Sequence, residues 1–218
     1  MSDLLVTVLL PCLNEAASLP AVLAGIPDGY RPLVIDNNST DGTANVARAH
    51  GADVIHESRP GYGAAVHAGV EAAGDSVVAV LDADGSLDPR ELPALVSELD
   101  RGADLVVGRR CPTVGLHWPL HARLGTAAVC WRLRGRYGLP IHDIAPMRVG
   151  RGAALLSLGI ADRRSGYPVE LLVRAAKAGW TVVERDVAYG PRTGGVSKVS
   201  GSLRGSAIAA LDFWRSAR

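Results

Sequence analysis

The sequence predicts an α/β fold: a single domain with a Rossmann-like, doubly wound and mostly parallel sheet flanked by helices. Short runs rich in valine, leucine and isoleucine alternate with segments of helical spacing up to residue 110, which is the pattern of a parallel sheet. The run at 77–81 is apolar throughout, as expected of a strand that is covered on both faces. At 218 residues, the chain is long enough to bury one sizeable core.

Residues 1–110 predict five strands and four helices. Each predicted strand is an apolar run that stops at a turn residue, and each predicted helix has apolar residues at intervals of three and four. The strands are expected at 4–10, 32–35, 52–56, 77–81 and 104–107. The helices are expected at 14–24, 43–50, 64–73 and 89–99.

The alternation changes beyond residue 110. We expect helical stretches within 117–136, an edge strand at 141–149, a helix at 169–178 and a strand at 181–187. A loop rich in glycine, serine and basic residues spans 189–204, and the pattern of 203–214 predicts a final amphipathic helix. We expect its apolar face to dock on the domain, with docking on a membrane surface as the alternative.

The composition excludes several classes of protein. A net charge of +1 gives no basic field for nucleic acid. The cysteines Cys12, Cys111 and Cys130 are odd in number and widely spaced, which argues against a disulfide framework and favours a reducing cytoplasm. No apolar run reaches the ~18 residues of a membrane span, and the N-terminus lacks a basic signal-peptide region. We expect a cytoplasmic protein, with peripheral contact at the inner face of a membrane left open.

Acidic residues gather where the predicted strands end. Asp82 and Asp84 directly follow the strand at 77–81. In extended backbone, side chains two apart point the same way, and two carboxylates suit a hard divalent cation that also binds phosphate oxygens. Glu15, Asp36 and Asp41 follow earlier strands, and acids that converge repel each other unless a cation lies among them. Each acid alone also fits a turn or a helix cap.

Two further features favour a nucleotide diphosphate as the ligand. Asp36 or Asp41 could accept hydrogen bonds from a base or a ribose. Arg59 supplies a positive charge, and 61–63 (Gly-Tyr-Gly) offers backbone amides that we expect to be unhindered near a phosphate.

Six segments carry a family resemblance: 10–15 (LPCLNE), 34–43 (VIDNNSTDGT), 61–65 (GYGAA), 82–85 (DADG), 108–110 (GRR) and 194–201 (GGVSKVSG). Over roughly residues 5–204 the chain resembles the family 2 glycosyltransferases, which have the nucleotide-sugar-binding GT-A fold. It is most similar to the branch of the dolichol-phosphate mannose synthases and polyprenyl-phosphate glycosyltransferases.

The resemblance implies a donor site and a metal site. The residues that match the pocket for the base and ribose, or lie along it, are Pro11, Leu13, Glu15, Asp36, Asp41, Arg59 and Gly63. Asp82, Ala83 and Asp84 match the family's D-x-D motif, which implies binding of Mg²⁺ or Mn²⁺ on the diphosphate, with Asp84 as the direct ligand.

The resemblance also implies an acceptor site. Asp143 falls at the family's catalytic or acceptor-positioning aspartate: it would act as a general base toward a hydroxyl, or orient groups if the acceptor is an ionised phosphate. The alternative for Asp143 is a purely structural role at the end of a strand. Arg123, Arg192 and Lys198 match basic positions around the phosphates, the last two in a loop that could close as a lid. Glu170 matches an acid near the acceptor and equally fits a first-turn helix charge.

One departure concerns the acceptor pocket. The family's Gly-Phe-Arg after the catalytic aspartate is replaced by 145–148 (APMR), so the shape of that pocket stays open.

We therefore expect an inverting, metal-dependent glycosyltransferase. It would move a hexose from a nucleotide-diphosphate sugar to a polyprenyl phosphate or a small-molecule acceptor, with residues 1–110 binding the donor and 111–218 the acceptor. The expectation of a homodimer rests only on a weak analogy with relatives. One alternative is a sugar-1-phosphate nucleotidyltransferase, which favours a Gly-rich N-terminal loop that this chain lacks. The other is a non-catalytic nucleotide-sugar-binding protein, against which the joint presence of Asp82, Asp84 and Asp143 counts.

Overall fold

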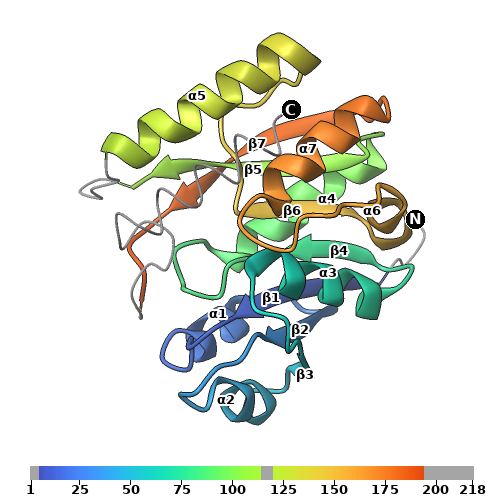
Figure 1. Cartoon of the computed structure of the whole chain (residues 1–218). Helices are drawn as coiled ribbons and strands as arrows, with labels where there is room; N and C mark the ends of the chain where they lie inside the picture. The colour runs from blue at the N-terminus through green and yellow to red at the C-terminus, as the bar shows by residue number, and fades with distance from the viewer. Residues whose placement is uncertain (1–4, 114–119, 194–218) are drawn as a thin grey trace.

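The computed structural model describes residues 5–113 and 120–193, which form a seven-stranded sheet with helices on both faces (Figure 1). The strands are β1 (Val6–Cys12), β2 (Tyr30–Asp36), β3 (Asp53–His56), β4 (Val77–Val80), β5 (Leu105–Pro112), β6 (Met147–Arg151) and β7 (Val182–Tyr189). The helices are α1 (Leu19–Gly25), α2 (Thr43–Ala49), α3 (Tyr62–Ala73), α4 (Leu92–Asp100), α5 (Leu120–Tyr137), α6 (Gly152–Ser157) and α7 (Tyr167–Lys177), with a 3₁₀ turn η1 (Pro89–Glu91) before α4.

The strand order places the loops that matter for function at one edge of the sheet. The order is β3-β2-β1-β4-β6-β5-β7, and all neighbours are parallel except β6, which is antiparallel to β4 and β5. The carboxyl ends of the parallel strands therefore share one edge. Because β6 runs the other way, the residues before it, including Asp143, reach that same edge. The prediction of a mostly parallel α/β sheet is confirmed.

The predicted edge strand at 141–149 is wrong in position and in extent. The strand begins at Met147, ends at Arg151, and lies in the interior of the sheet between β4 and β5. Ile141 and Ile144, whose apolar character suggested a strand, are buried in the irregular segment that precedes it. Ala145 has a φ of 52° there, outside the range of a regular strand. The sheet edges are instead β3 and β7.

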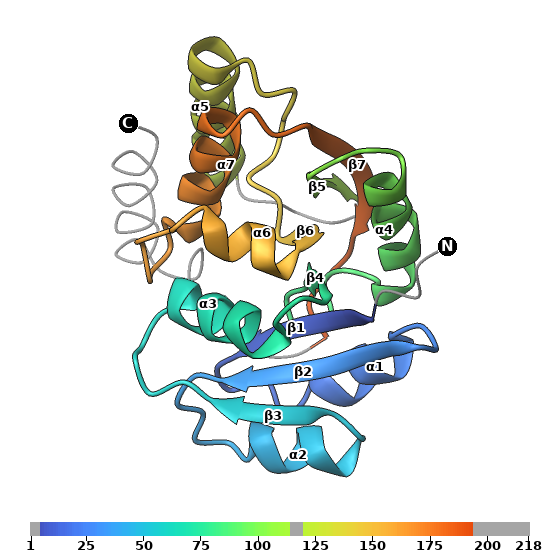
Figure 2. The ribbon, with the colours of Figure 1, turned by 90° about the vertical axis from the view of Figure 1, so that its right-hand side faces the viewer.

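Alternation along the strands gives the sheet two buried faces. On β1, Leu9 belongs to a core cluster shared with α3, α5 and α7, whereas Leu10 belongs to a second cluster shared with α1, α2 and α4. Figure 2 shows α3, α6 and α7 together on one side of the molecule and α4 on the other. Both faces being covered explains why β1 and β4 are apolar at successive positions.

The remaining differences from the sequence-based expectations are local. The helix expected at 14–24 begins only at Leu19, because Asn14 has a φ of 57° and the chain turns before it enters the helix. Helix α6 was not predicted. Lys198, the motif at 194–201 and the helix expected at 203–214 lie outside the described residues. Within the described residues, no helix is both long and apolar enough to span a bilayer.

Candidate active site

The loop after β1 is fastened to the loop after β2. The backbone amides of Asn14, Glu15 and Ala16 donate to Ser39 Oγ at 2.9 Å, Thr43 Oγ1 at 3.0 Å and Asp41 Oδ2 at 3.1 Å. These bonds hold the loop that carries the predicted donor residues Leu13 and Glu15 against the loop that carries Asp41. Pro11 and Glu15 are partly buried, Leu13 is 37% exposed, and Asp41 is exposed.

Asp41 has a structural task in this loop pair. Besides Ala16, its carboxylate accepts from the amide and the hydroxyl of Thr43 at 3.0 and 2.5 Å, at the start of α2. Burial opposes the charge, but these donors outweigh it and hold the pKa of Asp41 below its usual value. A ribose that bound here would share a carboxylate already used by the chain.

Asp36 ends β2 directly beside the end of β1. It pairs in register with Cys12 and is 8% exposed. Its Oδ1 accepts from the amide of Ser39 at 3.2 Å, and its Oδ2 lies 3.7 Å from His56 Nδ1. The buried Asn37 next to it accepts from the amide of Gly61 at 2.8 Å and donates to two backbone carbonyls of 57–59. Asn37 therefore fixes the path of the loop that enters α3.

The expectation of unhindered amides at 61–63 is wrong. The amide of Gly61 donates to Asn37, and that of Gly63 donates to the carbonyl of Arg164 at 3.1 Å. A Cβ on Gly63 would lie 2.8 Å from Arg163 C and from Tyr167 Cβ, so glycine is needed for close packing. Arg59 is exposed beside this loop.

Asp82 and Asp84 follow β4 on a short turn. Asp84 is 4% exposed, and its Oδ1 accepts from the amide of Ser86 at 2.9 Å. Between them, the buried Ala83 accepts at its carbonyl from Ser18 Oγ at 2.8 Å, which joins this turn to the loop after β1. Burial, with a smaller contribution from Asp84, raises the pKa of Asp82 to about 6. Two close, poorly hydrated carboxylates favour the binding of a cation.

A cation of the chain itself faces this pair. Arg192 Nη1 lies 2.8 Å from Asp84 Oδ2. The segment that carries Arg192 is held across the turn, because the amides of Gly190 and Thr193 donate to the carbonyls of Ser86 and Asp84 at 2.8 and 3.0 Å. The predicted role of Arg192 near phosphates is thus consistent with its position beside the D-x-D motif.

Asp143 forms a buried ion pair with Arg110. Its Oδ2 accepts from Arg110 Nε at 2.8 Å and from the Arg110 amide at 3.0 Å, while its Oδ1 accepts from Arg110 Nη2 at 2.7 Å and from the amide of Ile144 at 2.8 Å. Asp143 is 2% exposed. Its own amide donates to Glu184 Oε1 at 3.1 Å, and the guanidinium of Arg110 lies over the ring of Tyr189, 5.4 Å from its centroid. Four donors use the acceptor positions of a carboxylate.

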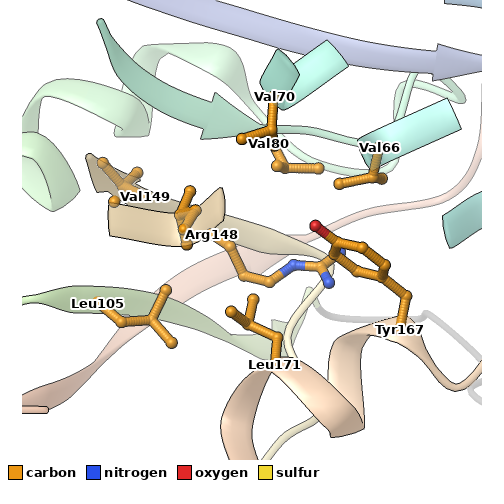
Figure 3. Close-up of a pocket in the computed structure, with 10 residues that line it drawn as sticks. Val66, Val70, Val80, Leu105, Arg148, Val149, Tyr167 and Leu171 are labelled. Atoms are coloured by element: carbon orange, nitrogen blue, oxygen red, sulfur yellow. The ribbon is translucent and has the colours of Figure 1, made fainter. Parts of the chain in front are cut away.

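Arg148 is a second buried arginine near Asp82. It follows Met147 on β6, is 3% exposed, donates to the hydroxyl of Tyr62, and its charge favours the ionised form of Asp82. Its Nε and Nη1 are buried and have no hydrogen-bond partner among the residues that the structure describes. Figure 3 shows its side chain pointing toward Tyr167 in a pocket whose walls are otherwise mostly apolar, formed by Val66, Val70, Val80, Leu105, Val149, Gly150, Leu155, Tyr167 and Leu171. A buried arginine of this kind supplies a fixed positive charge near Asp82.

Two predicted residues are not part of this network. Glu170, in the first turn of α7, accepts from the amides of Ala161 and Asp162 at 3.0 and 2.7 Å and pairs with Arg174 Nε at 2.6 Å. Its contacts support the segment whose carbonyls bind Gly63 and Ala64, which is a structural role. Arg123 is exposed on α5.

The donor set fits a divalent cation on a diphosphate. Among the described residues no group of three or more acidic, histidine or cysteine side chains is arranged to hold a metal. Asp82 and Asp84 supply two carboxylates, and Mg²⁺ is commonly held by one or two carboxylates with substrate phosphates and water completing its shell. Burial and, to a smaller extent, Asp84 raise the pKa of Asp82, so a cation bound beside it would favour its ionised form.

Sequence reasoning did not single out Arg110, Arg148 and Asn37. Arg110 was noted only as part of a motif, although the basic pair Arg109 and Arg110 lies in the second half of β5, toward the same sheet edge as the acids. Nothing in the sequence pairs it with Asp143, which is 33 residues away.

Comparisons with known proteins agree with this geometry. A family model described as "Glycosyl transferase family 2" matches residues 7–137. The chain is 72% identical over 210 residues to an uncharacterized glycosyltransferase of Mycobacterium tuberculosis, with 96% of each chain covered. It is 33% identical over 227 residues to an undecaprenyl-phosphate mannosyltransferase of Micrococcus luteus, with 96% of this chain and 93% of the relative covered.

Solved structures give the same fold. Glucosyl-3-phosphoglycerate synthase from Mycobacterium tuberculosis is 25% identical in two complexes. The complex with phosphoglyceric acid has a TM-score of 0.76 and covers 98% of this chain and 80% of that one. The complex with Mg²⁺ and uridine diphosphate has a TM-score of 0.75, with 98% and 78% covered. The chain therefore belongs to glycosyl transferase family 2 and has the GT-A fold.

Proposed function

We propose that this family 2 glycosyltransferase is an inverting, metal-dependent hexosyltransferase whose acceptor carries a phosphate, with polyprenyl phosphate as the first candidate. The observation that supports this most directly is the closed ion pair of Asp143 and Arg110, at the same sheet edge as the acid pair Asp82 and Asp84. In this proposal the enzyme recognises both substrates through their phosphate groups: the donor through its diphosphate and the acceptor through its phosphate monoester.

On the donor side, Asp82 and Asp84 would hold Mg²⁺ or Mn²⁺ on the diphosphate. When bound, the cation supplies positive charge that stabilises the leaving nucleoside diphosphate. Pro11, Leu13 and Asp36 would contact the base and ribose. Arg192 would exchange its contact with Asp84 for the diphosphate, because an arginine fork binds phosphate oxygens bidentately.

On the acceptor side, the state of Asp143 decides between two chemistries. A hydroxyl acceptor needs a general base, but both oxygens of Asp143 are already occupied by four N–H donors. A phosphate monoester is mostly ionised at neutral pH, since its second pKa is about 6, and it can attack without losing a proton. Asp143 would then act as a positioning residue that orients Arg110 toward the acceptor phosphate.

The comparisons support a phosphate-bearing acceptor of either size. The Micrococcus luteus relative is named for undecaprenyl phosphate, and the solved synthase was crystallised with phosphoglyceric acid. Because of the complex with phosphoglyceric acid, we propose a small phosphorylated acid as the alternative acceptor. The family match gives no support to the nucleotidyltransferase alternative.

The test is a transfer assay with matched acceptors. The purified chain is incubated with Mn²⁺ and either UDP-glucose or GDP-mannose, together with a short-chain polyprenyl phosphate, the free polyprenol or phosphoglyceric acid. We expect a glycosylated product with a phosphate acceptor and none with the polyprenol, detected by mass spectrometry, with the inverted anomeric configuration by NMR. Transfer to the free polyprenol at a similar rate would contradict the proposal.

Two variants complete this assay. Asp84→Asn should lose at least about a hundredfold in rate, because it removes one of two metal-binding carboxylates. Asp88→Asn is the matched control: Asp88 is exposed and caps η1 by accepting from the amide of Arg90 at 2.9 Å, and asparagine caps equally well. Full activity of Asp84→Asn, or of the wild type in EDTA, would show that the metal is not needed.

A further inference from the structure

The outer face of α5 exposes large apolar side chains. Of the five large hydrophobic residues exposed within the described part of the chain, three belong to this helix: Leu120 at 67%, Leu124 at 61% and Trp131 at 73%. At about 100° per residue, these three positions fall within about 40° of one another around the helix. They form a stripe, which the exposed Ala127 and Ala128 extend. Such a continuous stripe differs from scattered surface apolar residues, which need no explanation.

The stripe does not belong to the core of the domain. The opposite face of α5 carries Val129, Cys130 and Leu133, each at most 4% exposed, and packs on α7. Both Figures 1 and 2 show α5 at the margin of the molecule, at the end away from β3. The helix is therefore already fixed by one face and presents a second apolar face outward.

Positive charge flanks this stripe, and negative charge is absent from the sequence around it. Four arginines lie on α5, namely Arg123, Arg132, Arg134 and Arg136, whereas residues 105–142 contain no aspartate or glutamate. The whole chain has a net charge of only +1, so the basic charge is concentrated locally. Arg123 and Arg134 fall on one side of the stripe, and Arg132 and Arg136 on the other.

From this combination we propose that the outer face of α5 docks on an anionic lipid bilayer. Leucine and tryptophan side chains favour the boundary between headgroups and acyl chains, and arginines at the flanks can extend to lipid phosphates. A helix of 18 residues is about 27 Å long and would lie in the plane of the interface.

Charge also argues against a second copy of this chain as the occupant. Two α5 helices packed face to face would bring both sets of arginines together without an acid from either helix to neutralise them. An anionic surface neutralises them at no such cost. The proposal depends only on the surface chemistry of α5, and it holds whether the acceptor of the enzyme is a lipid phosphate or a soluble phosphate.

The experiment is co-sedimentation of the full chain with vesicles of phosphatidylcholine, with or without phosphatidylglycerol. We expect binding to the anionic vesicles, weakening as salt is raised, and little binding to phosphatidylcholine alone. Leu124→Gln with Trp131→Gln should lower the partition coefficient by at least about tenfold. Arg132→Gln with Arg136→Gln should lower it by about fivefold per arginine.

Matched controls lie on other elements. Leu5→Gln removes an exposed leucine, and Arg48→Gln with Arg90→Gln removes two exposed arginines; both should bind vesicles as the wild type does. These variants change exposed side chains except at Arg132, which is partly buried, and circular dichroism checks that every variant folds.

Several results would overturn the proposal. Equal binding to neutral and anionic vesicles, or α5 variants that bind as the wild type does, would exclude an anionic surface as the partner. So would a wild-type dimer that Trp131→Gln converts to a monomer, because the stripe would then contact a second copy. Loss of binding in Trp214→Gln, with normal binding in the α5 variants, would assign the membrane contact to the C-terminal segment.

Discussion

The pair of Arg110 and Asp143 has an energetic cost that a purely structural role would not explain. Both side chains are largely removed from water, with exposed fractions of 19% and 3%. A buried ion pair of this kind is often no more stabilising than apolar residues of the same volume, whereas removal of one partner costs about 3–5 kcal/mol. Its position beside the acid pair is better explained by recognition of an anion.

Asp143→Asn distinguishes positioning from base catalysis. If Asp143 orients Arg110 toward an ionised phosphate, the variant should raise KM for the acceptor about tenfold and leave the pH dependence of kcat unchanged. The reason is that no proton passes through this side chain. If Asp143 were a general base, kcat itself would fall by about 10²–10⁴. Steady-state kinetics over a range of acceptor concentration and pH separates the two.

The control for this variant is stability. Asparagine keeps the shape of aspartate but leaves the charge of Arg110 without its partner, so the free energy of unfolding should fall. Urea denaturation measures that loss. Kinetics are compared only at a temperature where the variant is folded. A large fall in kcat with unchanged KM would contradict the positioning role.

Residues that follow strands could be predicted, and residues that depend on distant partners could not. Asp82 and Asp84 interrupt an apolar run, so their local context indicates a site. Arg110 has its partner 33 residues away, and the side chain of Asn37 bonds to backbone groups 20 to 24 residues away. No local pattern encodes those contacts.

At the scale of elements, β6 shows where sequence patterns reach their limit. Its five residues include Met147, Arg148 and Gly150, which have no alternation that distinguishes a central strand from an edge strand. Its place is decided by pairing of Val80 with Arg148 and of Val106 with Val149. Helix α6, six residues long, is too short for periodicity to reveal it. Most strands and helices of residues 5–110 were predicted to within a few residues, but α1 begins five residues later than expected and β5 continues five residues further, to Pro112.

Helix α7 gives a pH-dependent prediction through Glu170. Burial raises the pKa of Glu170, but the amides of Ala161 and Asp162 and the charge of Arg174 outweigh burial and hold the pKa below its usual value. A lowered folded-state pKa means that ionised Glu170 stabilises the fold above the unfolded pKa of about 4.3, and that this contribution is lost as the pH falls through the folded value.

Glu170→Gln should therefore destabilise the fold at pH 7. The difference from wild type should shrink as the pH falls below the unfolded value of about 4.3 and vanish once the pH is below the lowered folded-state pKa. Because the carboxylate is partly exposed, screening limits the effect to about 1 kcal/mol, or about 2–4 °C in Tm. Thermal denaturation at a series of pH values measures it. Glu71→Gln, at an exposed site on α3, is the control. A difference that persists at low pH would exclude the electrostatic explanation.

At the scale of the whole molecule, the C-terminal end of the described chain returns to the D-x-D turn, which follows β4 near the middle of the sheet. The segment 190–193, after the last strand, bonds to backbone groups of Ser86 and Asp84 and places Arg192 against Asp84. Loops from β1, β4, β5 and β7 thus share one edge, although their strands are spread across the sheet. In the absence of a ligand, Arg192 supplies part of the positive charge that the acids require.

This arrangement predicts two effects of opposite sign for Arg192→Ala. Binding of Mn²⁺ alone should become about fivefold tighter, because the metal no longer has to displace Arg192 from Asp84. Breaking that ion pair costs about 1 kcal/mol. Binding of a nucleoside diphosphate with Mn²⁺ should become weaker by about tenfold, because an arginine contact to phosphate is lost. Isothermal titration calorimetry with Mn²⁺, and with Mn²⁺ plus UDP or GDP, measures both. The control Arg90→Ala, which removes an exposed arginine, should change neither binding constant. If Arg192→Ala binds Mn²⁺ alone no better than the wild type does, Arg192 does not compete with the metal.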